Sequence, residues 1–177
     1  MREIEVLAPA GSFDTMKAAY KAGADAVYMG GPMFGARAYA DNADAGQMLS
    51  AIDYAHLHGR KLYMTVNTLL KNTEIEGQLE DYIRPFYEQG LDAVIVQDLG
   101  VMEMIHTLFP DMAIHASTQM TVCGTDLRQM AQRSWRIKNC YTRELDLSRN
   151  CGYETADRGW RLRHLCMDAL VTCYSGQ

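Results

Sequence analysis

Polar side chains follow several short apolar runs of the sequence, at positions where they could bind a substrate. These positions are Asn67-Thr68, Gln97-Asp98 and His115-Ala116-Ser117-Thr118-Gln119, together with Gly30-Gly31 after an earlier run and Arg37 in the loop beyond it. Amide, carboxylate, imidazole, hydroxyl and guanidinium groups in one place suit a small polar or anionic substrate. The set contains no obvious nucleophile–base pair and no His/Asp/Glu spacing typical of a metal site.

Each of these residues also has a purely structural interpretation. Gly30-Gly31 could form a tight turn or cradle a phosphate. Asn67 and Asp98 could cap the helices that follow them. His115 could be a half-buried core histidine, although its place at a strand end favours function. His56 and His58 stand at a helix end, where we expect them to contact terminal carbonyl groups.

The residues up to about 130 alternate between strand and helix patterns. The apolar runs predict strands over residues 4–8, 26–30, 61–67, 93–97 and 113–117. Helical spacing predicts helices from Ser12 to Gly23, from about Asp44 to Gly59, over residues 74–89 and over residues 101–109. Continuous apolar strands alternating with amphipathic helices indicate a parallel sheet covered by helices.

The number of strand–helix units leaves two architectures open. A closed (β/α)8 barrel needs roughly 250 residues, and this chain has 177. The sheet is therefore either an open, doubly wound sheet or an incomplete TIM-barrel-like (β/α) domain with about five intact units. In both architectures the ligand site lies beyond the carboxyl ends of the strands, where the polar residues above are expected.

Composition narrows the class of protein. Hydrophobic residues make up 48% and charged residues 22%, as in one globular domain. The five cysteines form no C-x-x-C pair, so we expect reduced thiols and a cytoplasmic protein. A net charge of -5 argues against a general binder of DNA or other polyanions. No apolar run approaches the ~18 residues of a membrane span, so no membrane partner is expected.

Six ordered motifs carry a family resemblance. They are Val6-Leu7-Ala8-Pro9-Ala10-Gly11-Ser12, Gly23-Ala24-Asp25-Ala26-Val27-Tyr28, Phe34-Gly35-Ala36-Arg37-Ala38-Tyr39, Asn67-Thr68-Leu69, Val96-Gln97-Asp98-Leu99-Gly100 and His115-Ala116-Ser117-Thr118-Gln119. With their order and spacing the chain resembles the N-terminal part of the collagenase-like peptidase family "U-thirty-two". The likeness runs through residues 3–130 and resumes at Arg143-Glu144-Leu145 and at Cys173-Tyr174-Ser175-Gly176-Gln177.

The resemblance implies a barrel-like α/β domain and one of two activities. Members are labelled proteases of unassigned type, or carry out oxygen-independent hydroxylation of tRNA, rRNA or a quinone precursor with a cysteine-bound iron–sulfur cluster. The strand-end residues favour a small-molecule or RNA substrate over a proteolytic dyad. We therefore predict His115, Asp98 and Glu144 as catalytic residues, and Arg37, Asn67, Gln97, Ser117 and Gln119 as substrate-binding residues. An inactive remnant or binding domain is the third alternative.

The cysteine pattern departs from the family. A cluster ligand is expected two residues before Cys173, where this chain has Val171, and the next would directly follow Gln177. We expect this chain to hold no iron–sulfur cluster and, by itself, to be inactive.

The composition changes after residue 132. Residues 1–130 carry a net charge of -8 and residues 131–177 a net charge of +3, and seven of the twelve arginines fall between 133 and 163. Read one base later, permitted codons for residues 148–167 give QEIADMKQQTGVEIETFVHG, a family-like helix and strand. We hypothesise compensating frameshifts at 133–167, so that 1–132 is the barrel-like domain and 133–177 its irregular, truncated remainder; incompatible codons in the DNA would reject this. A basic RNA-contacting patch and a solvated surface segment are the alternatives.

Overall fold

The computed structural model describes residues 5–35, 43–120, 139–142 and 161–164. Its first half contains β1 (Leu7–Ala10), α1 (Phe13–Lys21), β2 (Ala26–Gly30), α2 (Ala45–Leu57) and β3 (Lys61–Val66). Next come α3 (Asn72–Glu74), the π-helix η1 (Ile75–Leu79), α4 (Glu80–Glu88), β4 (Ala93–Val96) and α5 (Leu99–Leu108). The last described elements are β5 (Ala113–Ala116), the 3-10 turn η2 (Thr118–Met120), β6 (Asn139–Thr142) and β7 (Arg161–His164).

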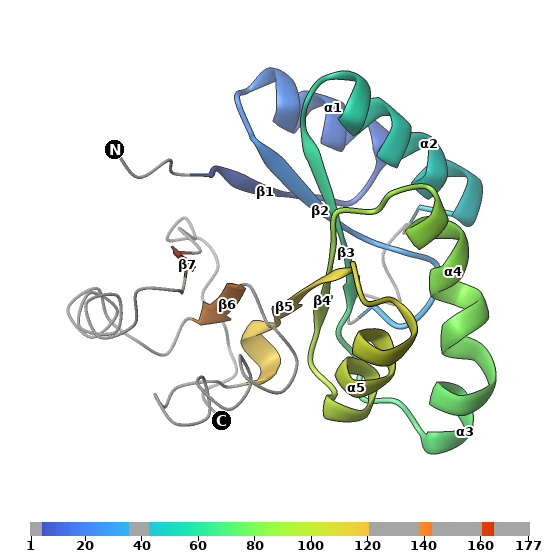
Figure 1. Ribbon diagram of the computed structural model, residues 1–177. Helices are drawn as coiled ribbons and strands as arrows, with labels where there is room; N and C mark the ends of the chain where they lie inside the picture. Colours follow the sequence, from blue (N-terminus) through green and yellow to red (C-terminus); the bar gives the residue numbers. More distant parts are fainter. Residues whose placement is uncertain (1–4, 36–42, 121–138, 143–160, 165–177) are drawn as a thin grey trace.

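The order of the strands decides between the two architectures. They pair in the order β1-β2-β3-β4-β5-β6-β7, and every neighbouring pair is parallel. A doubly wound sheet reverses its strand order at a switch point, whereas a barrel adds each strand next to the previous one. Helices α1, α2, α4 and α5 lie together on one side of the sheet (Figure 1). The fold is therefore the barrel-like α/β arrangement.

Both faces of β2 to β5 are buried, which explains their continuous apolar sequences. Alternate residues such as Val27, Met64 and Val94 pack under the helices in the larger core. The residues between them form a second core on the other face, which we call the inner face: Ala26, Tyr63, Ala93, Ile95 and Ala113, with Leu7 and Tyr28 packed against them.

The repeated sequence Gly-x-Asp-Ala has the same structural task in both copies. Gly23 and Gly90 adopt positive φ angles after α1 and α4, which glycine does without strain. Asp25 then accepts a hydrogen bond from the backbone N–H of Val6 at 2.9 Å, and Asp92 accepts one from Leu62 at 2.9 Å. Each aspartate thus holds the beginning of the neighbouring, preceding strand.

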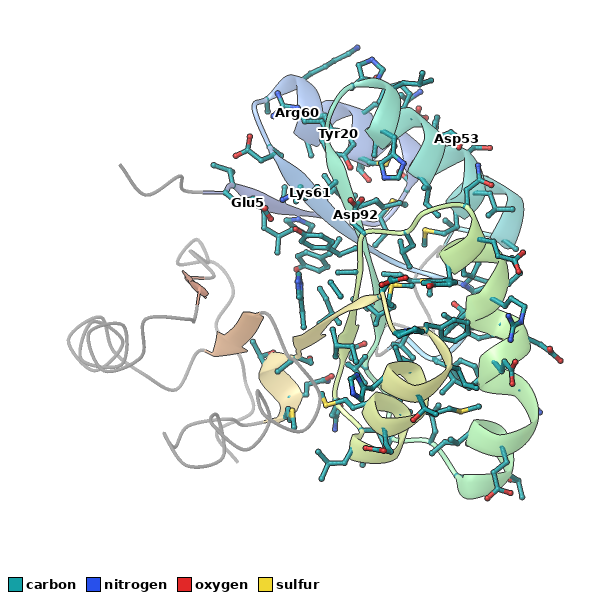
Figure 2. All side chains as sticks on the ribbon, in the orientation of Figure 1. Glu5, Tyr20, Asp53, Arg60, Lys61 and Asp92 are labelled. Atoms are coloured by element: carbon teal, nitrogen blue, oxygen red, sulfur yellow. The ribbon has the colours of Figure 1, made fainter. Side chains whose placement is uncertain are left out.

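Each aspartate also has a cationic or imidazole partner from α2 or its end. Arg60 Nη1 lies 2.9 Å from Asp25 Oδ1, and His56 Nε2 lies 3.1 Å from Asp92 Oδ2. Arg60 and Asp92 lie at the same edge of the sheet (Figure 2). This amino-terminal edge is consequently a structural edge, built to fix strand register.

We expect Asp92→Ala to reduce the free energy of unfolding by about 1–3 kcal/mol, because it leaves the Leu62 N–H without its carboxylate acceptor. Thermal denaturation followed by circular dichroism measures the effect. Asp111→Ala, at an exposed position, is the control. Equal melting temperatures for the two variants would contradict the assigned role of Asp92.

The first strand prediction was wrong in detail. The first strand covers Leu7–Ala10 rather than residues 4–8 and includes Pro9. Among the described strands β1 pairs only with β2, and a proline without an N–H is tolerated at such an edge. Within the remainder from 133 onward, which was expected to be irregular, the described residues form β6 and β7.

Side-chain periodicity did not predict β6 and β7, and the way these strands pair explains why. β6 pairs through His115↔Asn139 and Ala116↔Cys140, and β7 pairs with β6 over four residues. The backbone N–H and C=O groups at the edge of β5 pair with β6, and those of β6 pair with β7. Such pairing does not depend on the side chains of these short segments. The other residues of 133–167 lie outside the described ranges, and the frameshift hypothesis stays a prediction. No helix among the described residues has the length and apolarity to cross a bilayer.

Candidate functional site

His115 lies on the inner face, level with residues of four other strands. Gly30, Thr65, Ile95, His115 and Asn139 are successive register partners across β2 to β6. His115 is 2% exposed, and its ring meets the Tyr63 ring edge-on at a centroid distance of 4.7 Å. The imidazole is therefore held by packing inside the arc of strands.

Tyr63 is itself fixed from the opposite edge of the sheet. Its hydroxyl donates to Glu5 Oε1 at 2.6 Å, and Lys61 Nζ lies 2.8 Å from Glu5 Oε2. Glu5 and Lys61 lie side by side near the beginning of β1 and β3 (Figure 2). A hydrogen bond from a phenol to an ionised carboxylate is short and strong, so it restricts the tyrosine below the histidine.

Asn67, Gln97 and Ser117 form the next level toward the carboxyl ends. Each comes directly after a register partner, because Val66 pairs with Val96 and Val96 with Ala116. Asn67 Nδ2 donates to Ser117 Oγ at 3.5 Å, and the Ser117 N–H donates to the Val96 carbonyl at 2.8 Å. Ser117 is 3% exposed. We call Asn67, Gln97, His115 and Ser117 the strand-end cluster.

Asp98 and Gln119 lie at the rim of this cluster. Asp98 Oδ1 accepts hydrogen bonds from the N–H groups of Gly100 at 2.7 Å and Val101 at 3.1 Å. Asp98 is thus the N-cap of α5, as one of its two interpretations predicted. The exposed Gln119 donates its backbone N–H to Ser117 Oγ at 3.4 Å. Arg37 and Glu144 lie outside the described residues.

Residues 31–35, which directly follow β2, lie over the same end of the sheet. The carbonyl of Phe34 accepts hydrogen bonds from Thr68, from its N–H at 3.3 Å and its hydroxyl at 3.1 Å. A Cβ on Gly35 would lie 3.5 Å from the Thr65 hydroxyl. Residues 31–35 are therefore seated on the end of β3, beside Asn67.

Tyr82 of α4 holds the outer side of this loop, and the sequence patterns did not single it out. Its hydroxyl donates to the Met33 carbonyl at 3.0 Å, and its ring meets Phe34 edge-on at 5.2 Å. A Cβ on Gly31 would overlap that hydroxyl, so glycine at position 31 allows the Tyr82 hydroxyl to approach the loop closely. In the sequence, only the adjacent glycines Gly30-Gly31 suggested a close contact at this place.

The half-buried Tyr82 hydroxyl predicts an alkaline loss of stability. Burial raises the pKa of Tyr82 to about 12, compared with about 10 in an unfolded chain. The unfolded chain releases this proton first as pH rises, so stability is full below pH ~10 and falls by about 2–3 kcal/mol as pH rises through the folded value.

Urea denaturation between neutral pH and pH 12 measures this loss. Tyr82→Phe should show a shallower decline, and Tyr87→Phe, on the same helix, should behave as the wild type. Some decline should persist in every variant, because burial also raises the pKa of Tyr20. Identical profiles for wild type and Tyr82→Phe would contradict the assignment.

Chemically, the strand-end cluster offers neutral donors and acceptors around one imidazole. Amides, a hydroxyl and a histidine can recognise an uncharged polar group and move a proton. In the parts of the chain that the structure describes, no group of three or more His, Cys, Asp or Glu residues could hold a metal ion. Four of the five cysteines lie outside those parts, so the cofactor prediction stays open.

Comparisons with known proteins place the chain in a family. The family described as Peptidase family U32 matches residues 11–177. The 23S rRNA 5-hydroxycytidine C2501 synthase of Escherichia coli is 33% identical over 98% of this chain and 26% of its own length. The tRNA hydroxylation protein P of the same organism is 30% identical over 98% of this chain and 38% of its own length.

A protease relative and a solved structure agree with these matches. The collagenase of Porphyromonas gingivalis is 28% identical over 75% of this chain and 32% of its own length. The structure of a U32 peptidase superposes with a TM-score of 0.72 at 11% identity, covering 93% of this chain and 69% of that one. The chain spans well under half of these curated relatives, and it belongs to peptidase family U32.

Proposed function

We propose that this chain is the N-terminal barrel part of a protein that hydroxylates tRNA or rRNA without molecular oxygen. The similarity to an rRNA hydroxycytidine synthase and a tRNA hydroxylation protein, over 98% of the chain in each case, supports this proposal. The chain covers 26% and 38% of the length of those proteins.

The contacts of Ser117 are the observation that favours RNA chemistry over peptide hydrolysis. A serine nucleophile needs a base that accepts its proton. The amide of Asn67 and the N–H of Gln119 both donate to Ser117 Oγ instead. Neither of these two contacts supplies a base for the hydroxyl proton, which favours recognition over attack.

The proposed roles follow from the donors and acceptors of each group. The amides of Asn67 and Gln97 each present a donor and an acceptor, as the edge of a nucleobase requires. His115 is the group that can exchange a proton with the bound base. Arg37, Gln119 and Glu144 complete the predicted site, with Asp98 capping the start of α5 at its rim.

Profiling of modified nucleosides tests the proposal. Deleting the gene that encodes this chain should remove one hydroxylated nucleoside from either the tRNA or the rRNA of its host, and the intact gene should restore it. Mass spectrometry of the two separated RNA fractions identifies the substrate. Unchanged nucleosides in both fractions would reject the proposal.

A collagenase-like protease is the second candidate, favoured by the similarity to the Porphyromonas gingivalis enzyme. Peptide hydrolysis by the purified protein, abolished by one Ser, Cys or His substitution, would establish it. Absence of both activities would leave the third alternative, an inactive remnant or binding domain.

A further inference from the structure

Tyr82 belongs to the helical layer, yet its hydroxyl reaches the loop beside the strand-end cluster. It donates to the Met33 carbonyl at 3.0 Å, and the Met33 N–H approaches the same oxygen at 3.4 Å. Its ring is packed edge-on between Phe34 at 5.2 Å and Phe86 at 5.5 Å. A residue of α4 therefore holds the backbone of the 31–35 loop at Met33.

The backbone conformation of residues 31–35 requires contacts that hold it in place. Phe34 adopts a φ of 59°, a left-handed conformation that costs energy for an aromatic residue. Thr68 binds the Phe34 carbonyl from the strand side. Gly31 leaves the space that the Tyr82 hydroxyl occupies. The two contacts hold the loop from opposite sides.

The held loop lies next to the proposed site. Gly35 packs over Thr65, which belongs to the same register level as His115. Thr68 directly follows Asn67 in the chain. Any displacement of residues 31–35 consequently changes the wall of the strand-end cluster on the β2–β3 side.

We propose that Tyr82 is a positioning residue, which sets that wall by anchoring the 31–35 loop to α4. The inference rests on the proposed function, because it concerns the same site. It adds a residue that contacts no member of the strand-end cluster in any interaction described above. Losing the hydroxyl should free the loop while leaving the ring packing in place.

The first test measures the loop directly. Amide hydrogen exchange should become about five- to tenfold faster at Met33 and Thr68 in Tyr82→Phe, the ratio expected for one lost hydrogen bond. Amides of Val94 and Ile114, in the middle of the sheet, should keep the wild-type rate. Tyr87→Phe is the matched control, because Tyr87 lies on the same helix and packs on Phe109. Unchanged exchange in Tyr82→Phe overturns the inference.

The second test measures the site. Both variants are introduced into the full gene, and hydroxylated nucleosides are quantified in the complemented deletion strain at equal protein abundance. Tyr82→Phe should lower the yield several-fold, whereas Tyr87→Phe should match the wild type. Faster exchange with an undiminished yield would show an anchor without a positioning role and would overturn the inference. Failure of the wild-type gene to restore the nucleoside would instead reject the proposed function, and the role of Tyr82 in that site with it.

Discussion

Replacing His115 by asparagine is expected to lower the yield of the hydroxylated nucleoside by about 100-fold or more, the range for loss of a general acid–base group. His115 is the imidazole of the strand-end cluster and is 2% exposed. Tyr63 packs edge-on against it, and Glu5 holds the tyrosine hydroxyl. Asparagine keeps a polar group there but cannot exchange protons near neutral pH.

The measurement is nucleoside profiling of the deletion strain carrying the variant gene. His106→Asn is the control, because His106 lies in the last turn of α5 and is not part of the cluster. Because His115 is buried, His115→Gln is included and the melting temperature of each variant is recorded. A folded His115 variant that retains most of the wild-type yield would remove His115 from the catalytic residues.

Substituting Gly31 by alanine is expected to reduce the free energy of unfolding by about 2–4 kcal/mol, the sum of an overpacking cost and one lost hydrogen bond. The new Cβ would overlap the Tyr82 hydroxyl and would lie 3.2 Å from Met64 Sδ. Packing against Phe34 and Phe86 leaves the tyrosine ring little room to withdraw. The hydroxyl must then leave the Met33 carbonyl.

A second substitution distinguishes this clash from a general intolerance of Gly31. In Gly31→Ala combined with Tyr82→Phe, the nearest remaining ring atom is Tyr82 Cζ, 3.4 Å from the new Cβ. The double variant should therefore recover more than about 1 kcal/mol relative to additivity. Gly77→Ala, where no atom lies within 4 Å of the added Cβ, should be close to neutral. Urea denaturation measures all four proteins, and additive losses would contradict the Gly31–Tyr82 contact.

Local chemistry accounts for the parts of the fold that the sequence predicts well. Ser12 accepts from the Thr15 N–H and begins α1 as expected, with Asp14 in the first turn beside Lys17. Gly23 ends that helix because it adopts a positive φ. These signals act over a few residues, so they can be identified without knowing the rest of the molecule.

The two histidines near the end of α2 show which contacts local sequence signals can predict and which they cannot. His58 contacts the Tyr54 carbonyl at 2.8 Å, as predicted from its place in the helix. His56 was predicted to do the same, and this was wrong: it contacts Asp92 at 3.1 Å, beyond β3 and α4 in the chain. A partner 36 residues away depends on how the elements pack.

The sequence of this protein, taken alone, determined its alternating elements, its parallel strands and the edge at which its polar strand-end residues gather. Apolar runs, caps and glycine stops are local, and parallel strands bring their carboxyl ends to one edge. Only the tertiary structure decided the consecutive strand order, the recruitment of β6 and β7, and the seating of Tyr82 over Gly31. These features arise from backbone pairing and side-chain contacts between segments far apart in the chain, and no periodicity within a segment encodes them.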